Sequence, residues 1–90
     1  MSEASRTVRI ENRRGLHARA SAKFVTLAST QSVQLTVEKD GSCVTATSIM
    51  GLMMLGAAMG DSIVIRAEGD GAEDAVAALA QLVEDRFGED

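Results

Sequence analysis

The segment VQLTVEKDGSCVTA, residues 33–46, lies between two stretches of helical spacing. In residues 33–37 apolar and polar side chains alternate, which is the pattern of a half-buried strand. Asp40-Gly41 is a strong signal for a tight hairpin turn, and residues 43–46 would form the returning strand. We therefore expect an antiparallel β-hairpin in the middle of the chain.

The N-terminal side of this hairpin contains one further strand and one helix. Residues 6–11 alternate between apolar and charged side chains and predict a short strand, and residues 12–15, Asn-Arg-Arg-Gly, predict a turn. From Ala18 the apolar residues follow helical spacing as far as residues 29–30. The chain's single histidine, His17, falls at or just before the first turn of this helix.

The C-terminal side begins with a short helix and a strand. Thr47 and Ser48 are plausible N-caps, because their hydroxyls can accept hydrogen bonds from the free amides of a first turn. The helix would cover residues 49–55, and the β-branched residues 63–65 would form a fourth strand.

The last helix has the clearest pattern. Asp70 and Glu73 have the spacing of a capping box at its start. An apolar stripe then recurs at steps of three and four residues: Ala75, Val76, Leu79, Leu82, Val83 and Phe87.

The predicted order of elements is β-α-β-β-α-β-α. This order is typical of an α+β fold, an open-faced β-sandwich in which a four-stranded, mainly antiparallel sheet has three helices on one face. No repeat, linker or low-complexity segment divides the chain, so we expect one domain over residues 1–90.

The composition excludes several classes of protein. One His, one Cys, two Phe and no Trp or Tyr leave no disulfide framework, no Cys/His zinc cluster and no aromatic platform for single-stranded nucleic acid. Four methionines between residues 50 and 59 could suggest a soft-metal site, but core filling with an exposed contact patch explains them more simply. We expect neither a metal nor a cofactor.

Charge is distributed unevenly along the chain. The net charge is -4, yet residues 1–30 contain six Lys or Arg against two Glu, whereas residues 31–90 contain three against eleven acidic residues. The acidic total argues against a nucleic-acid or anionic-membrane binder. The polar N-terminus and short apolar runs predict neither a secretory signal nor membrane insertion, so we expect a cytoplasmic protein.

His17 is the candidate nucleophile. A helix that starts just after it would direct unpaired backbone amides and the positive end of the helix dipole towards the imidazole. A phosphoryl group on a ring nitrogen would meet those amides and the Arg19 guanidinium. The alternative is a solvated histidine in an ordinary turn.

The short helix at residues 49–55 has two apolar faces. Leu52 lies with Leu55 on one face, and a second face is formed by Ile49, Met50 and Met53. A helix packed on a sheet buries only one face fully, so we expect the second face to be an exposed patch that binds a partner protein. A deeply buried short helix is the alternative.

Two motifs resemble those of the HPr family, the histidine phosphocarriers of the bacterial phosphoenolpyruvate-dependent phosphotransferase system. Gly-Leu-His-Ala-Arg-Ala-Ser at residues 15–21, followed by Lys-Phe-Val at residues 23–25, resembles the family's active-site motif. Thr-Ser-Ile-Met-Gly-Leu at residues 47–52 resembles its regulatory serine motif. The resemblance implies an HPr-like fold over essentially the whole chain.

The resemblance also implies a function. His17 would accept a phosphoryl group on Nδ1 (the pros nitrogen) from phospho-enzyme I and donate it to a histidine of an enzyme IIA-type acceptor. Arg19 would attend the phosphoryl group. Such a protein is a monomeric carrier without turnover of its own. We expect its partner-binding residues to be Ala18, Ala20, Ile49, Met50 and Met53.

Ser48 would be the target of an HPr kinase/phosphorylase, in either a sugar-transport or a nitrogen-related regulatory branch. The sequence departs from the motif at Ala20, where the family usually has proline. An alternative function is a docking module that is switched by phosphorylation and has no carrier turnover. A third, a small-ligand or metal-carrying domain of similar topology, lacks its usual cysteine pair.

Overall fold

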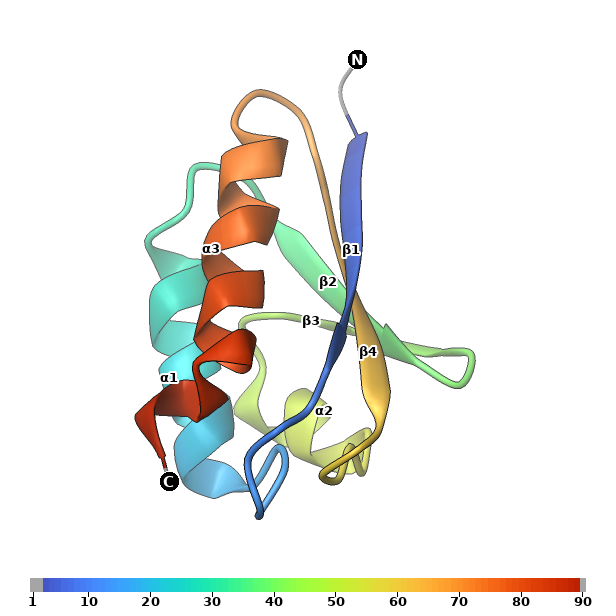
Figure 1. The fold of residues 1–90 in the computed structure, drawn as a ribbon. Coiled ribbons are helices and arrows are strands. Elements are labelled where there is room, and N and C mark those ends of the chain that lie inside the picture. Colours follow the sequence, from blue (N-terminus) through green and yellow to red (C-terminus); the bar gives the residue numbers. More distant parts are fainter. Residues whose placement is uncertain (1–2, 90) are drawn as a thin grey trace.

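The four strands form one antiparallel sheet in the order β1-β4-β2-β3 (Figure 1). The computed structural model describes residues 3–89. The strands are β1 (Glu3–Arg9), β2 (Leu35–Lys39), β3 (Ser42–Thr45) and β4 (Ser62–Glu68). The β2-β3 pair is the hairpin predicted in the middle of the chain, and β4 joins it to the N-terminal strand.

Three helices cover one face of this sheet (Figure 1). They are α1 (Ala18–Ser29), α2 (Ile49–Met54) and α3 (Ala72–Glu84), and a short 3-10 turn, η1 (Arg86–Gly88), follows α3. The predicted α+β class and β-α-β-β-α-β-α order are confirmed. Within residues 3–89, no helix is long and apolar enough to cross a membrane.

Burial alternates along the strands because only one face of the sheet is covered. In β4 the side chains of Ile63, Ile65 and Ala67 are buried beneath the helices. Between them, on the uncovered face, Arg66 forms an ion pair with Glu38 of β2. The buried residues form one aliphatic core with two phenylalanines, as expected for a chain so poor in aromatic residues.

The arrangement of the helices brings distant parts of the chain together. Helix α1 packs against both α2 and α3. The turn after α3 lies beside the beginning of α1 in Figure 1, and α1 contacts η1. The last residues of the described chain therefore lie close to the segment around His17.

Some details of the expected elements are wrong. The first strand ends at Arg9 rather than continuing to residue 11, although Ile10 is fully buried and its amide donates to the Asp61 carbonyl at 2.8 Å. The Asp70 capping box does not form, because the N-cap of α3 is Gly71, in a left-handed conformation (φ 88°) without a side-chain hydrogen bond. The other elements occur where predicted, with shifts of a few residues at their ends.

Candidate functional site

His17 is the N-cap of α1. Its backbone is extended (φ -76°, ψ -179°), and the Arg19 amide donates a hydrogen bond to Nδ1 over 3.3 Å. The Ser21 amide donates to the His17 carbonyl at 2.9 Å, which is the first helical hydrogen bond. The predicted position of the imidazole at the helix start is thus correct, and the ring faces the positive end of the helix dipole.

The turn before His17 is fixed by its backbone. Gly15 has φ +65°, and a Cβ atom there would lie 2.3 Å from the Ala57 carbonyl oxygen, so no larger residue fits. The next amide, of Leu16, donates to that same carbonyl at 2.9 Å. Ala57 follows the end of α2, so this peptide ties the His17 turn to the loop after α2.

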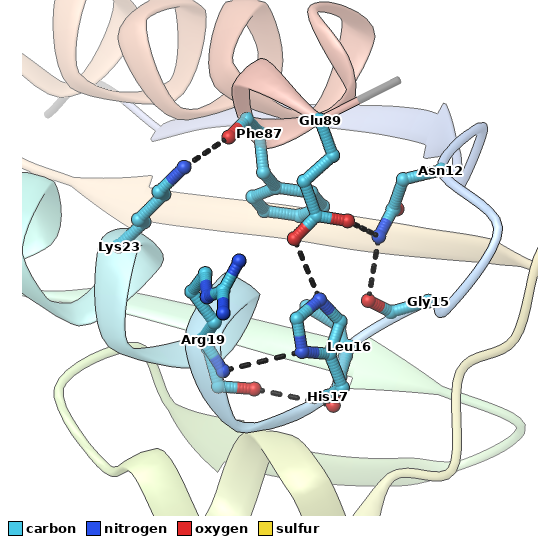
Figure 2. A network of polar contacts seen from close by, with 9 residues as sticks. Asn12, Gly15, Leu16, His17, Arg19, Lys23, Phe87 and Glu89 are labelled. Atoms are coloured by element: carbon cyan, nitrogen blue, oxygen red, sulfur yellow. Dashed lines mark hydrogen bonds and ion pairs between the residues drawn. The ribbon is translucent and has the colours of Figure 1, made fainter.

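A carboxylate lies on the other side of the imidazole (Figure 2). Glu89 Oε2 is 2.6 Å from His17 Nε2, and the two side chains are only 16% and 20% exposed. The fully buried Asn12 amide donates both to Glu89 Oε1 at 3.0 Å and to the Gly15 carbonyl at 2.8 Å. Neither Asn12 nor Glu89 was predicted as a site residue.

The segment after α3 turns sharply to bring this carboxylate to the ring. Arg86, Phe87 and Gly88 all have φ between +55° and +74°. The predicted stripe placed Phe87 on the last helix, but α3 ends at Glu84 and Phe87 lies in the turn, with its side chain buried. Lys23 Nζ of α1 donates to the Phe87 carbonyl at 2.7 Å and holds the turn against α1 (Figure 2).

The surroundings keep Glu89 ionised. Burial alone raises the pKa of its carboxyl. The hydrogen bonds from Asn12 and His17, together with the charges of His17 and Lys23, lower the pKa by more than burial raises it. The net pKa is below the ordinary value. Glu89 is therefore a carboxylate at neutral pH, and it accepts hydrogen bonds at both oxygens.

The residues next to His17 differ in exposure. Ala18 and Arg19 are exposed, and the Arg19 side chain makes no ion pair with any residue between 3 and 89. Ala20 is fully buried in the core. The expectation that Ala20 binds a partner is therefore wrong, because its side chain already packs inside the molecule.

Ser48 is the N-cap of α2. Its hydroxyl oxygen accepts a hydrogen bond from the Gly51 amide at 2.9 Å, and its backbone is extended. The residue is half-buried. Within residues 3–89 no hydrogen bond or ion pair joins the Ser48 hydroxyl to the His17 side chain, although the helices that follow the two residues pack together.

Helix α2 exposes one apolar face. Leu52 is fully buried and Leu55 nearly so, whereas the residues expected on the other face are exposed. Met54 at the end of α2 and Met59 in the loop that follows are exposed as well. We call the exposed set the methionine patch: Ile49 (40% exposed), Met50 (68%), Met53 (40%), Met54 (80%) and Met59 (58%). The predicted division into a buried and an exposed face is confirmed, and the alternative of a deeply buried helix is wrong.

Comparisons with known proteins bear on the family and the fold. The family model described as "PTS HPr component phosphorylation site" matches residues 4–85. The phosphocarrier protein HPr of Cupriavidus necator is 43% identical over 84 residues, 93% of this chain and 94% of that protein. The phosphocarrier protein NPr of Shewanella violacea is 37% identical over 89 residues, 99% and 98% of the two chains.

A solved structure gives the same result for the fold. A crystal structure of HPr from Thermoanaerobacter tengcongensis matches with a TM-score of 0.89 and 49% identity, over 100% of this chain and 99% of that one. The chain therefore belongs to the HPr family, the phosphocarrier proteins of the phosphotransferase system, and is a carrier rather than a catalytic enzyme.

Proposed function

We propose that His17 carries the phosphoryl group on Nδ1, accepts it from a phosphohistidine of enzyme I and passes it to a histidine of an enzyme IIA-type acceptor. The observation that carries this proposal is the contact of Nδ1 with the Arg19 amide at the start of α1. Because that amide is a donor, Nδ1 presents a lone pair, which is what a nucleophile requires.

The chemistry is a displacement at phosphorus. The Nδ1 lone pair forms the new P–N bond while the donor's P–N bond breaks, and that electron pair returns to the donor's ring. The amides at the start of α1 can then donate to the phosphoryl oxygens. Arg19, exposed and free of an ion pair within residues 3–89, supplies a guanidinium to the same group.

Partner proteins would dock on the surface that surrounds the ring. Ala18 is exposed beside His17, and the methionine patch offers Ile49, Met50 and Met53 on the adjoining helix. Methionine-rich apolar surfaces adapt to several partners, which suits a carrier that meets enzyme I and an enzyme IIA in turn. The basic residues near the N-terminus would steer acidic partner surfaces towards this site.

Ser48 would be a regulatory phosphorylation site for an HPr kinase/phosphorylase. A phosphate there would lie at the positive end of α2 and beside the exposed Ile49. The added charge would interrupt an apolar docking surface. Phosphorylation of Ser48 would therefore slow acceptance of the phosphoryl group by His17.

We also propose that the protein works as a monomer in the cytoplasm. The relatives bear both the HPr and the NPr name, so their names do not assign the chain to the sugar-transport or the nitrogen-related branch. The branch is defined by the acceptor that the protein serves. Transfer assays with a sugar-specific and a nitrogen-related enzyme IIA decide between the two branches.

The decisive experiment is incubation with phosphoenolpyruvate and enzyme I, followed by intact-mass measurement before and after acid treatment. We expect one acid-labile phosphate on the parent protein and none on His17→Ala. A parent protein that its cognate enzyme I leaves unlabelled would overturn the proposal. Phosphorylation of that same unlabelled protein by an HPr kinase at Ser48 would favour the docking module.

A further inference from the structure

The two nitrogens of the His17 ring face partners of opposite hydrogen-bonding character. The Arg19 backbone N–H can only donate, and it points at Nδ1. The Glu89 carboxylate can only accept, and it lies 2.6 Å from Nε2. Both contacts are satisfied by the same neutral form of the ring, with the lone pair on Nδ1 and the proton on Nε2.

We propose that Glu89 is a positioning residue, which holds the ring proton of His17 on Nε2 during both the acceptance and the release of the phosphoryl group. This inference rests on the proposed function of His17. It adds to the site a residue that lies 72 positions after His17 and outside the motif around it.

The proton on Nε2 has a defined part in each step. During acceptance the Nδ1 lone pair bonds to phosphorus, so the ring becomes a cation, and the Glu89 carboxylate stabilises that charge through Nε2–H. During release the P–N bond breaks and its electron pair stays on Nδ1. The ring then leaves as neutral imidazole, because Nε2 has kept its proton throughout.

Asn12 positions the Glu89 carboxylate but leaves its own amide oxygen without a hydrogen bond in the described part of the chain. Its amide nitrogen donates to Glu89 Oε1 and to the Gly15 carbonyl, whereas its buried Oδ1 has no hydrogen-bond partner within residues 3–89. A buried acceptor without a partner is destabilising. The amide is thus oriented to serve Glu89 and the turn before His17.

The backbone that delivers Glu89 is also unusual. Two non-glycine residues, Arg86 and Phe87, adopt positive φ, which is costly for a bulky side chain. Burial of the Phe87 ring and the hydrogen bond from Lys23 hold this conformation. Strained backbone of this kind is concentrated at functional sites, and here it directs a carboxylate onto the imidazole.

The first test determines where the ring proton lies. Long-range proton–nitrogen NMR spectra of the unphosphorylated protein should place the proton of the neutral ring on Nε2, with a detectable Nε2–H resonance that Glu89→Ala loses through exchange with water. A neutral ring in the parent protein with its proton on Nδ1 would overturn the proposal. This test does not depend on phosphorylation.

The second test is the pH profile of phosphoryl loss from the isolated phosphoprotein. Among residues 3–89, Glu89, Arg19 and Lys23 are the charged groups around the ring (Figure 2), and Arg13 and Arg14 are exposed in the preceding turn. Removing the Glu89 charge with Glu89→Gln should move the rise in hydrolysis rate to lower pH by about 0.5 to 1 unit. Glu84→Gln removes an exposed carboxylate at the end of α3, in the same C-terminal part of the chain, and should leave the profile unchanged.

The third test is the rate of transfer from enzyme I. Glu89→Gln and Glu89→Ala should slow it about three- to tenfold, with partial recovery in Glu89→Asp. Circular dichroism verifies that the variants fold. Rates and pH profiles equal to those of Glu84→Gln would overturn the role of Glu89 while leaving the proposed function of His17 intact. Failure of the parent protein to accept phosphate would instead count against the proposed function.

Discussion

The beginnings of α1 and α2 use the same local device in different surroundings. His17 and Ser48 are both N-caps with extended backbone, and the side chain of each accepts a hydrogen bond from an amide of the first turn. The imidazole also meets a carboxylate and lies next to an exposed guanidinium, whereas the hydroxyl lies beside the methionine patch. The neighbours, rather than the cap itself, decide which chemistry each helix start can perform.

The largest effect should come from separating the cap of α1 from its nucleophile. In His17→Asn the side-chain oxygen can still cap the helix, but no ring nitrogen remains to accept phosphate. We expect complete loss of acid-labile labelling by enzyme I, measured by intact mass, with an unfolding free energy within about 1 kcal/mol of the parent. Ser48→Asn, the matched change at the other cap, should label normally. Labelled His17→Asn would contradict the distinction between the two helix starts.

A negative charge on the second cap should reach the first through the docking surface. We expect Ser48→Asp to slow labelling of His17 by enzyme I about tenfold, because the charge interrupts the apolar patch beside Ile49. Ser48→Asn controls for the change of shape. Initial rates of labelling measure the effect, and equal rates for the Asp and Asn variants would show that charge at this position is irrelevant.

Loss of the second cap should affect stability. Ser48→Ala leaves the Gly51 amide without its 2.9 Å acceptor and should cost about 1 kcal/mol in urea unfolding. Ser42→Ala, at an exposed position in β3, is the control. If the two alanine variants unfold at the same urea concentration, the Ser48 cap does not stabilise α2.

The smallest effect should be a pH dependence confined to the first site. The folded state lowers the pKa of Glu89, so it binds fewer protons there than the unfolded chain does. The contribution of Glu89 to the stability of the fold is fully present above the ordinary pKa of 4.5 and is lost as the pH falls through the lower folded pKa. Between pH 6 and pH 3, the unfolding free energy of Glu89→Gln should fall less than that of Glu84→Gln. We expect the difference to be under about 1 kcal/mol. Identical slopes would contradict the contact.

The sequence was sufficient for the fold because its signals are local. The alternation in residues 33–37, the Asp40-Gly41 turn and the helical spacing after Ala18 each depend on a few neighbouring residues. The positions of His17 and Ser48 at helix starts followed from the same patterns. The Asp70 capping box failed because Gly71, in a left-handed conformation, takes the cap position itself.

The missing half of the site depends on contacts that no local pattern encodes. Glu89 reaches His17 across 72 residues, through a turn in which Phe87 adopts a conformation that its residue type disfavours. Helical spacing therefore assigned Phe87 to the end of the last helix. Asn12 was assigned to a turn, and only the structure shows that its amide is buried and joins that turn to Glu89.

The close approach at Gly15 has a consequence for how the protein tolerates mutation. Any Cβ at this position would collide with the Ala57 carbonyl, and the amide of the next residue, Leu16, donates a hydrogen bond to that same carbonyl. A substitution there would displace the turn that ends in His17 and the loop that follows α2 in one event. In a library of random variants, we expect Gly15 to be as intolerant of replacement as His17, although Gly15 performs no chemistry.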